Sequence, residues 1–86
     1  MKLKKEFIAH NGAGESLLVP AGGAEFVGIV RGNRTFGAIL DLLKEETDED
    51  TVVRGMCERF NGDRARIAAD VHRAIESLRE IGALEE

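Results

Sequence analysis

The spacing of hydrophobic and polar residues changes near residue 33 and divides the chain into a strand-rich part and a helix-rich part. Before residue 33, short apolar runs alternate with glycines and one proline, which is typical of strands joined by tight turns. After residue 33, apolar residues recur at three- and four-residue intervals, as on one face of an amphipathic helix. The pattern predicts an α+β fold in which three strands precede three helices, with strands and helices segregated.

Three strands are expected in the first part, over residues 7–10, 16–20 and 25–31. The Asn11-Gly12 pair suits the positive φ angles of a hairpin turn between the first two. The third strand, 25–31, is apolar on both faces: Phe26 and Val30 point to one side, and Val27 and Ile29 to the other.

The first two helices are expected over 34–45 and from Thr47 onward. Asn33 suits the N-cap of the first, because its side-chain oxygen can accept a hydrogen bond from an amide of the first turn. Thr47 is expected to cap the second. Their buried faces are predicted from the apolar spacing, with Phe36, Ile39, Leu40 and Leu43 on the first, and Val52, Val53, Met56, Cys57 and Phe60 on the second.

The third helix is expected over about 64–81, with Asp63 as its N-cap. Gly62 suits a left-handed C-cap of the preceding helix, and Gly82 suits the end of the third. Its buried stripe is predicted to consist of Ile67, Val71, Ala74, Ile75, Leu78 and Ile81.

Length and composition predict one small domain over residues 1–86. The formal net charge of −4 disfavours nucleic-acid binding, which relies on cations placed against phosphates. The N-terminus lacks the apolar stretch of a signal peptide, and no run approaches the roughly 20 apolar residues of a membrane span. With one cysteine for 86 residues, these features predict a cytoplasmic protein with no membrane partner.

Residues suited to catalysis are sparse and scattered. His10, Cys57 and His72 do not have the spacing of metal ligands, and Cys57 falls on a predicted buried face, where a thiol stays protonated. No nucleophile–base pair is visible. We therefore expect no catalytic residues, no metal site and no cofactor.

The third predicted strand carries the functional prediction. In a three-stranded meander it forms an edge, and natural edges are commonly protected by charge or proline. Here the charged residues, Glu25 and Arg31, stand only at its ends. Either a helix of the protein covers this edge, or the edge accepts an extended peptide as an additional strand.

The sequence also resembles the PqqD family at two places. The first match is Phe26-x-Gly28-x-Val30-x-x-Asn33-x-Thr35-x-x-Ile39-Leu40-x-Leu42-Leu43. The second is Asp70-Val71-x-x-Ala74-Ile75-x-x-Leu78-x-x-x-Gly82-Ala83-Leu84. The resemblance implies a winged-helix-like fold and a non-catalytic role as the recognition element of a peptide-modifying pathway. Such proteins bind the leader of a ribosomally made precursor peptide and deliver it to a modifying enzyme, often a radical S-adenosylmethionine enzyme.

The family binds its peptide between the third strand and the third helix, which places the candidate contacts in this chain. The strand side would be Glu25, Phe26, Val27, Gly28, Ile29, Val30 and Arg31. For the helix side, the sequence leaves two shoulders of the apolar stripe open. One carries Asp70, Ala74 and Ser77, with Arg66 and Arg73 further round, and the Asp70-Val71 match favours it. The other carries Arg64, Ala68 and Arg79.

Two further interpretations stay open at this level. A winged-helix nucleic-acid-binding domain fits the order of elements but not the charge. A structural module that forms a homodimer through its edge strand fits the same apolar strand. These residues do not determine the leader sequence, the partner enzyme or the oligomeric state. They also leave open whether the final product is pyrroloquinoline quinone or comes from another modified peptide.

Overall fold

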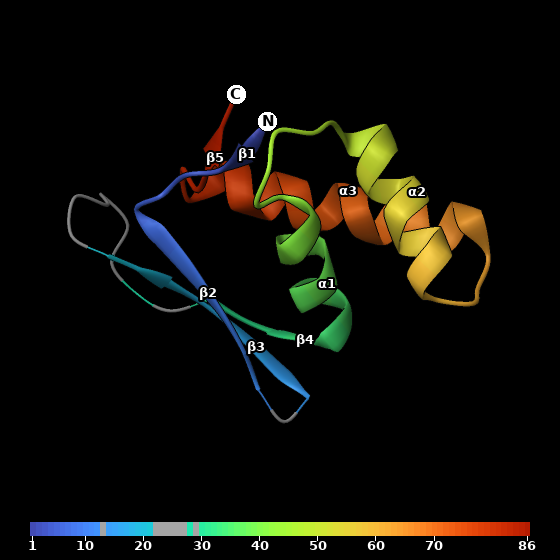
Figure 1. The fold of residues 1–86 in the computed structure, drawn as a ribbon, viewed down its shortest axis with the longest axis horizontal. Coiled ribbons are helices and arrows are strands. Elements are labelled where there is room, and N and C mark those ends of the chain that lie inside the picture. The colour runs from blue at the N-terminus through green and yellow to red at the C-terminus, as the bar shows by residue number, and fades with distance from the viewer. Residues whose placement is uncertain (13, 22–27, 29) are drawn as a thin grey trace.

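The computed structural model describes residues 1–12, 14–21, 28 and 30–86, and three helices cover one side of an antiparallel sheet in it (Figure 1). The main strands are β2 (Phe7–Gly12), β3 (Glu15–Pro20) and β4 (Val30–Asn33), in that order across the sheet. The helices are α1 (Arg34–Leu42), α2 (Glu49–Arg59) and α3 (Arg64–Glu80). The predicted α+β order of three strands followed by three helices is confirmed.

The sheet is built around β3, which pairs with both neighbours. Leu18 lies opposite Ala9 of β2 and Val30 of β4. Gly12 pairs with Glu15, so only residues 13 and 14 connect these two strands, and Gly14 has the positive φ of +79°. The expectation of positive φ at Asn11-Gly12 was therefore wrong, because strand pairing continues through both residues and moves the turn along the chain.

The third strand differs from its predicted range. Residues 25–27 and 29 lie outside the described residues, and β4 runs from Val30 to Asn33, two residues past the predicted end. Gly28 forms a bend with a φ of +141°, a conformation that glycine adopts readily and other residues rarely. A regular strand through Gly28 was therefore a wrong prediction.

Two short strands that the sequence pattern did not predict join the ends of the described chain. β1 (Lys2–Leu3) pairs antiparallel with β5 (Leu84–Glu85), and Figure 1 shows the two termini side by side. The amide of Leu3 also donates to the carbonyl of Leu43 at 2.8 Å. These contacts tie the C-terminal end of α1 to the segment that follows α3. Pairs of only two residues carry too little periodicity to be recognised in a sequence.

The helix N-caps follow local chemistry. Asn33 and Asp63 accept hydrogen bonds from Phe36 N at 3.0 Å and Ala65 N at 3.2 Å, so both predicted caps are confirmed. The cap of α2 is Asp48 and not Thr47, with Thr51 N donating at 2.8 Å. A carboxylate serves better here than a hydroxyl, because it also faces the positive end of the helix dipole. Hydrogen bonds from the side chain and backbone of Thr51 hold the pKa of Asp48 below its usual value.

The helix C-termini show a similar mixture of outcomes. Gly82 has a φ of +71° directly after α3, as expected for the residue that ends the helix. Gly62 is not among the glycines with positive φ, because α2 already ends at Arg59 and its C-cap, Phe60, is extended. The first helix is also shorter than predicted and ends at Leu42 instead of residue 45.

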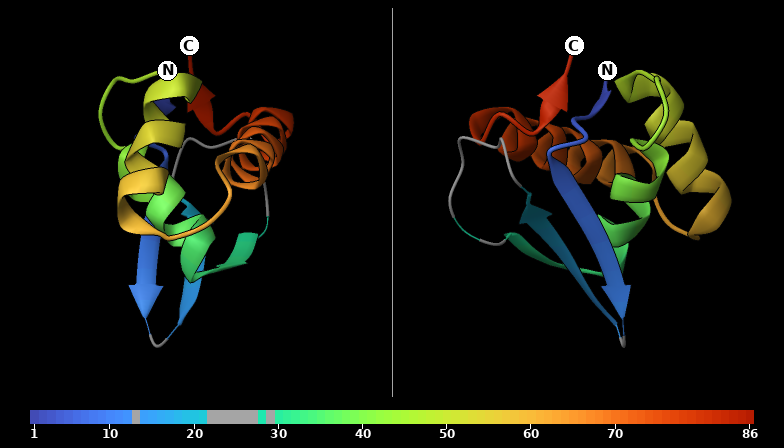
Figure 2. Two further views of the ribbon diagram at one scale, coloured as in Figure 1. Left: turned by 90° about the vertical axis from the view of Figure 1, so that its right-hand side faces the viewer. Right: turned by 60° about the vertical axis from the view of Figure 1, so that its left-hand side comes forward.

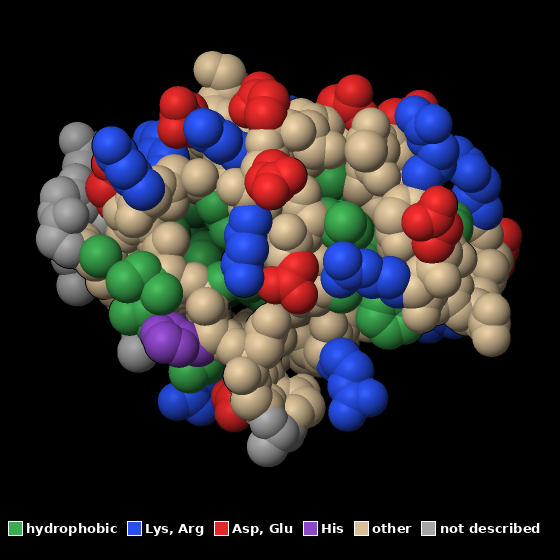
Figure 3. Space-filling model, viewed as in Figure 1, with side chains coloured by type: hydrophobic (Ala, Val, Ile, Leu, Met, Phe, Trp, Pro, Cys, Tyr) green, Lys and Arg blue, Asp and Glu red, His purple; other side chains and the backbone are tan. Residues whose placement is uncertain are grey.

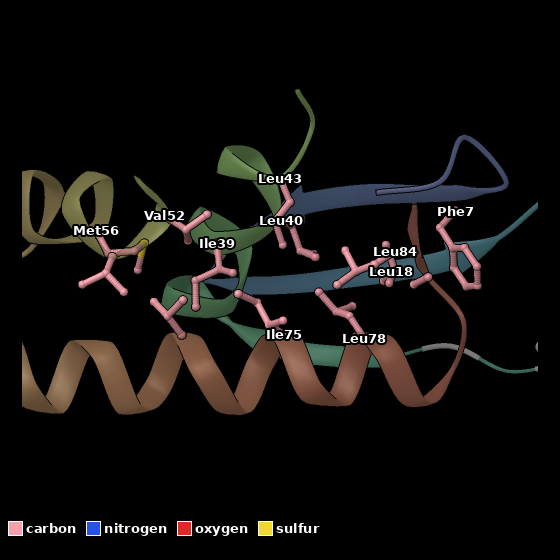
Figure 4. Packing of buried hydrophobic residues seen from close by; sticks show 13 residues of the cluster. Phe7, Leu18, Ile39, Leu40, Leu43, Val52, Met56, Ile75, Leu78 and Leu84 are labelled. Carbon is pink, nitrogen blue, oxygen red and sulfur yellow. The ribbon is translucent and has the colours of Figure 1, made fainter. Parts of the chain in front are cut away.

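The core lies between the sheet and the three helices. Ile75 and Leu78 point from α3 toward Ile39 and Leu40 of α1 and toward Leu18 of β3 (Figure 4). The predicted apolar faces supply its centre, although Cys57 is only half-buried and packs against the core from its margin. Because one side of α3 is fixed by these contacts, its remaining faces are held in a defined position relative to β4.

One glycine of β4 permits the close approach of α1. A Cβ at Gly32 would lie 2.7 Å from Cβ and 2.3 Å from Cδ2 of Phe36. Gly32→Ala is therefore expected to lower the free energy of unfolding by about 1–3 kcal/mol, as for other overpacked sites. Urea unfolding measures this, with Gly12→Ala as the matched control, since nothing lies within 4 Å of a Cβ there. Equal stability of the two variants would contradict the predicted collision.

Candidate functional site

The edge of β4 is the first part of the candidate site. Among the described residues β4 pairs only with β3, so the opposite edge of this strand has no strand neighbour. The two-residue connection after Gly12 makes Gly12 and Glu15 a hydrogen-bonded pair. Along antiparallel strands, hydrogen-bonded pairs alternate with pairs whose backbone groups point away from each other. Val30 and Gly32 should then bond to β3, while the backbone groups of Arg31 face the open edge.

A groove separates this edge from α3. We call it the β4–α3 groove, and its volume is about 540 Å³. Its strand side consists of Val30, Arg31, Gly32 and Asn33, together with Phe36 from the first turn of α1. Its helix side consists of Arg73, Ala74, Ser77, Leu78, Glu80 and Ile81. The groove therefore offers an open strand edge beside an apolar floor.

Charged side chains flank this floor. Arg31 is 76% exposed and forms an ion pair with Glu15 at 3.8 Å. Arg73 is 73% exposed and forms an ion pair with Asp70, one helical turn away. Such exposed pairs contribute little to stability and exchange readily for other partners. Two guanidinium groups are thus placed to meet carboxylates on a bound molecule, while Glu80 gives the groove one acidic position.

A second depression continues along the same face of α3. We call it the α2–α3 hollow, and its volume is about 320 Å³. Arg66 and Asp70 line this hollow and not the groove. The other lining residues are Thr35, Met56, Phe60, Asn61, Gly62, Asp63, Ile67 and Val71.

The residues expected from the sequence are therefore divided between several places. Val30, Arg31, Arg73, Ala74 and Ser77 lie together in the β4–α3 groove, whereas Arg66 and Asp70 lie in the hollow beyond it. Glu25, Phe26, Val27 and Ile29 lie outside the described residues, and Gly28 is an exposed bend that precedes β4. Of the two shoulders left open, the one with Ala74 and Ser77 faces β4, while Arg79 of the other pairs with Glu76 and Glu86.

Several lining residues were not identified from the sequence as parts of a site. Gly32 and Phe36 belong to the groove through their packing against each other, and Asn33 was interpreted only as a cap. Leu78 and Ile81 were assigned to the core. Leu78 and Ile81 each lie four positions after Ala74 and Ser77, respectively, on the same side of the helix, so this spacing would have placed them at the margin of the groove.

Other polar clusters of the described residues are ion pairs on the surface. His72 Nδ1 lies 3.1 Å from Glu49 Oε2 on the exposed surface. Hydrogen bonds to Glu86 and Glu76 raise the pKa of Arg79, which favours its charged form. Within the described ranges, no group of three or more His, Cys, Asp or Glu residues is placed to hold a metal ion. The described helices include none that is long and apolar enough to cross a membrane.

Surface charge is mixed on the face shown in Figure 3, where basic and acidic side chains alternate over the helices. Figure 2 shows the β2–β3 hairpin extending away from the helices, like the wing of a winged-helix fold. A wing beside a helix is also found in nucleic-acid-binding folds. Here α3 carries Asp70, Glu76 and Glu80 among its arginines, and such a mixture is unfavourable against a phosphate backbone.

Comparisons with known proteins agree with this fold. The profile of the family described as coenzyme PQQ synthesis protein D (PqqD) matches residues 17–84. No curated protein sequence shows significant similarity to the chain. Among solved structures, the chain is similar to that described as TbiB1 in complex with the TbiA(beta) leader peptide. The TM-score is 0.73 at 18% identity, covering 99% of this chain and 100% of TbiB1, which supports the same fold.

Proposed function

The chain belongs to the PqqD family, and we propose that it binds the leader segment of a ribosomally made precursor peptide in the β4–α3 groove. The observation that carries the proposal is an edge of β4 that no strand of the described residues pairs with, beside a groove with an apolar floor. An extended peptide would add a strand to this edge and insert alternate side chains toward α3. TbiB1, which has a similar fold, was solved with a leader peptide.

The groove supplies enough interaction for useful affinity. Each backbone hydrogen bond to the edge of β4 contributes roughly 1 kcal/mol net. An apolar side chain buried against Phe36, Leu78 and Ile81 adds roughly 1.5–3 kcal/mol. Four such bonds and two buried side chains contribute about 7–10 kcal/mol together, and the cost of ordering the peptide lowers this, so a dissociation constant between about micromolar and millimolar is expected.

Charge at the rim would select the peptide. Arg31 and Arg73 flank the groove, and Arg66 follows on the same face of α3. A guanidinium group matches the geometry of a carboxylate, so acidic leader residues are the expected partners. Because these arginines are largely exposed, they should affect specificity and the rate of encounter more than affinity.

The role that follows is presentation and not catalysis. The bound peptide would keep its remaining length free for a modifying enzyme, for which a radical S-adenosylmethionine enzyme is the proposed class from the family resemblance. Neither a catalytic residue nor a cofactor of its own is required of the binding protein. Whether the assembly contains one copy or two is left to measurement.

The binding proposal is tested by NMR titration with synthetic candidate leader peptides, chosen from short reading frames near the gene. Amide shifts should concentrate in β4, in the residues preceding it and in α3. Shifts confined to the outer surfaces of α1 and α2, or no shifts at all, would contradict the proposal. Light scattering on the same sample separates peptide binding from dimerisation through β4, since a dimer that uses this edge leaves no room for the peptide.

Substitution of Arg31 tests the strand pairing itself. Arg31→Pro removes an amide that should face the open edge, and proline is tolerated at such edge positions. We expect at least tenfold weaker leader binding with an unchanged far-ultraviolet circular dichroism spectrum. Arg31→Ala is the control, because it removes the charge but keeps the amide, and its affinity should fall only a few-fold. Equal loss in both variants would mean that the guanidinium group and not the backbone carries the interaction.

A further inference from the structure

The α2–α3 hollow begins where β4 ends, so it lies in the path of a peptide paired with that strand. Asn33 is the last residue of β4 and lines the groove, and Thr35, two residues later, lines the hollow. On α3, the lining residues pass from the groove into the hollow along one helical face, with the Asp70–Arg73 ion pair at the boundary. The two depressions have no lining residue in common, but residues close together in the chain line them on both walls, with this ion pair between them.

The chemistry of the hollow suits an apolar side chain. Met56 and Val71 have at most 1% of their surface exposed and form its floor, while Phe60 and Ile67 are half-buried beside them. Arg66 stands exposed at the rim, and within the described residues it has no ion-pair partner. An apolar side chain of the peptide can be buried here while a neighbouring acidic residue reaches Arg66.

We propose that the α2–α3 hollow is a second anchoring site for the leader peptide, which receives a Leu, Ile, Met or Phe side chain beyond the segment paired with β4. This inference rests on the proposed function and specifies the peptide that the groove accepts. In that peptide two apolar anchors occupy the two depressions, and an acidic residue lies next to the anchor in the hollow.

The spacing of the anchors follows from the geometry of α3. Ile67 in the hollow and Ser77 in the groove are ten positions apart, or about 15 Å along the helix axis. An extended peptide advances about 3.3 Å per residue, so about four to five residues span this distance. A peptide that stays extended beyond β4 keeps alternate side chains on the same side, which selects the even separation of four residues. The leader should therefore carry its anchors at positions i and i+4.

A substitution that fills the hollow tests the inference. A Cβ at Gly62 would sit 3.8 Å from Cδ1 of Ile67 in ordinary contact, so the first atom of a Gly62→Leu side chain fits beside a lining residue of the hollow. Gly12→Leu is the matched control on the β2–β3 hairpin, where a Cβ meets nothing within 4 Å. The probe is a displayed library of random peptides long enough to reach both depressions, selected on the wild-type protein and measured by fluorescence anisotropy.

We expect the selected peptides to carry apolar residues at i and i+4. They should bind the Gly62→Leu variant at least tenfold more weakly than wild type, and should bind the Gly12→Leu variant as tightly as wild type. Replacing the distal anchor of the peptide by alanine should abolish the difference between Gly62→Leu and wild type. If Gly62→Leu fails to fold, Ile67→Ala replaces it, because this change removes part of the wall of the hollow. Ile67→Ala should then weaken binding of peptides that carry the distal anchor and leave binding of peptides with alanine at that position unchanged.

Other outcomes separate the two proposals. Selected peptides that bind wild type and Gly62→Leu equally, with shifts confined to β4 and the facing part of α3, overturn the second anchor and leave the groove intact. A library that yields no binder, or binders insensitive to Arg31→Pro, overturns the proposed function together with this inference.

Discussion

Replacing Ser77 by tryptophan is expected to weaken leader binding by about 100-fold while the protein stays folded. Ser77 is exposed on α3 and lines the β4–α3 groove, so a large side chain at this position occupies the space of the peptide. The loss corresponds to about 3 kcal/mol, which equals one buried anchor together with the backbone bonds that its displacement breaks. Isothermal titration calorimetry with the leader peptide measures the change.

The control is a tryptophan on the same helix that points elsewhere. His72 is exposed and faces Glu49 of α2, so His72→Trp adds similar bulk to α3 outside the groove and the hollow. The weak pair with Glu49 that it removes is exposed and contributes little. We expect wild-type affinity for this variant. A similar loss in both variants would show that bulk anywhere on α3 disturbs binding, and would exclude the groove as its specific location.

Much of the fold was predictable because helices and strands leave repeating signals. The stripe with Ile39, Leu40 and Leu43 placed the buried face of α1, and Asn33 and Asp63 marked helix starts through cap chemistry that acts over three residues. Predictions failed where tertiary contacts decided the outcome. Pairing of β2 with β3 continued through Asn11 and Gly12, and it moved the positive φ to Gly14.

The site was predictable to a smaller extent. A helix periodicity identifies the face that is buried, but the two margins of that face are equivalent until the direction of the neighbouring strand is known. The position of β4 decides between them, and this depends on Gly32 allowing Phe36 to pack directly against the strand. The α2–α3 hollow required the actual turn at Asn61 and Gly62, whose geometry differs from the left-handed cap that the sequence predicts.

The helix that forms one wall of the groove is itself held by few core side chains. Ile75 has no exposed surface and points from α3 into the core (Figure 4). Its neighbour in the chain, Ala74, lines the groove. Ile75→Ala is expected to lower the free energy of unfolding by about 2–5 kcal/mol through lost burial and a residual cavity. For a domain of this size, whose total is about 4–13 kcal/mol, such a loss is a large fraction.

The same substitution at an exposed position provides the comparison. Ile8 on β2 is 47% exposed, so Ile8→Ala removes the same atoms but should change the unfolding free energy by less than about 1 kcal/mol. Urea unfolding of the two variants measures the difference, and similar midpoints would mean that α3 is not fixed through Ile75. Since only the folded state has the groove, leader peptide at about 100 times its dissociation constant should restore about 2.7 kcal/mol to Ile75→Ala. Ser77→Trp combined with Ile75→Ala should gain almost nothing from the same peptide concentration, because the wall of the groove is then in place but blocked.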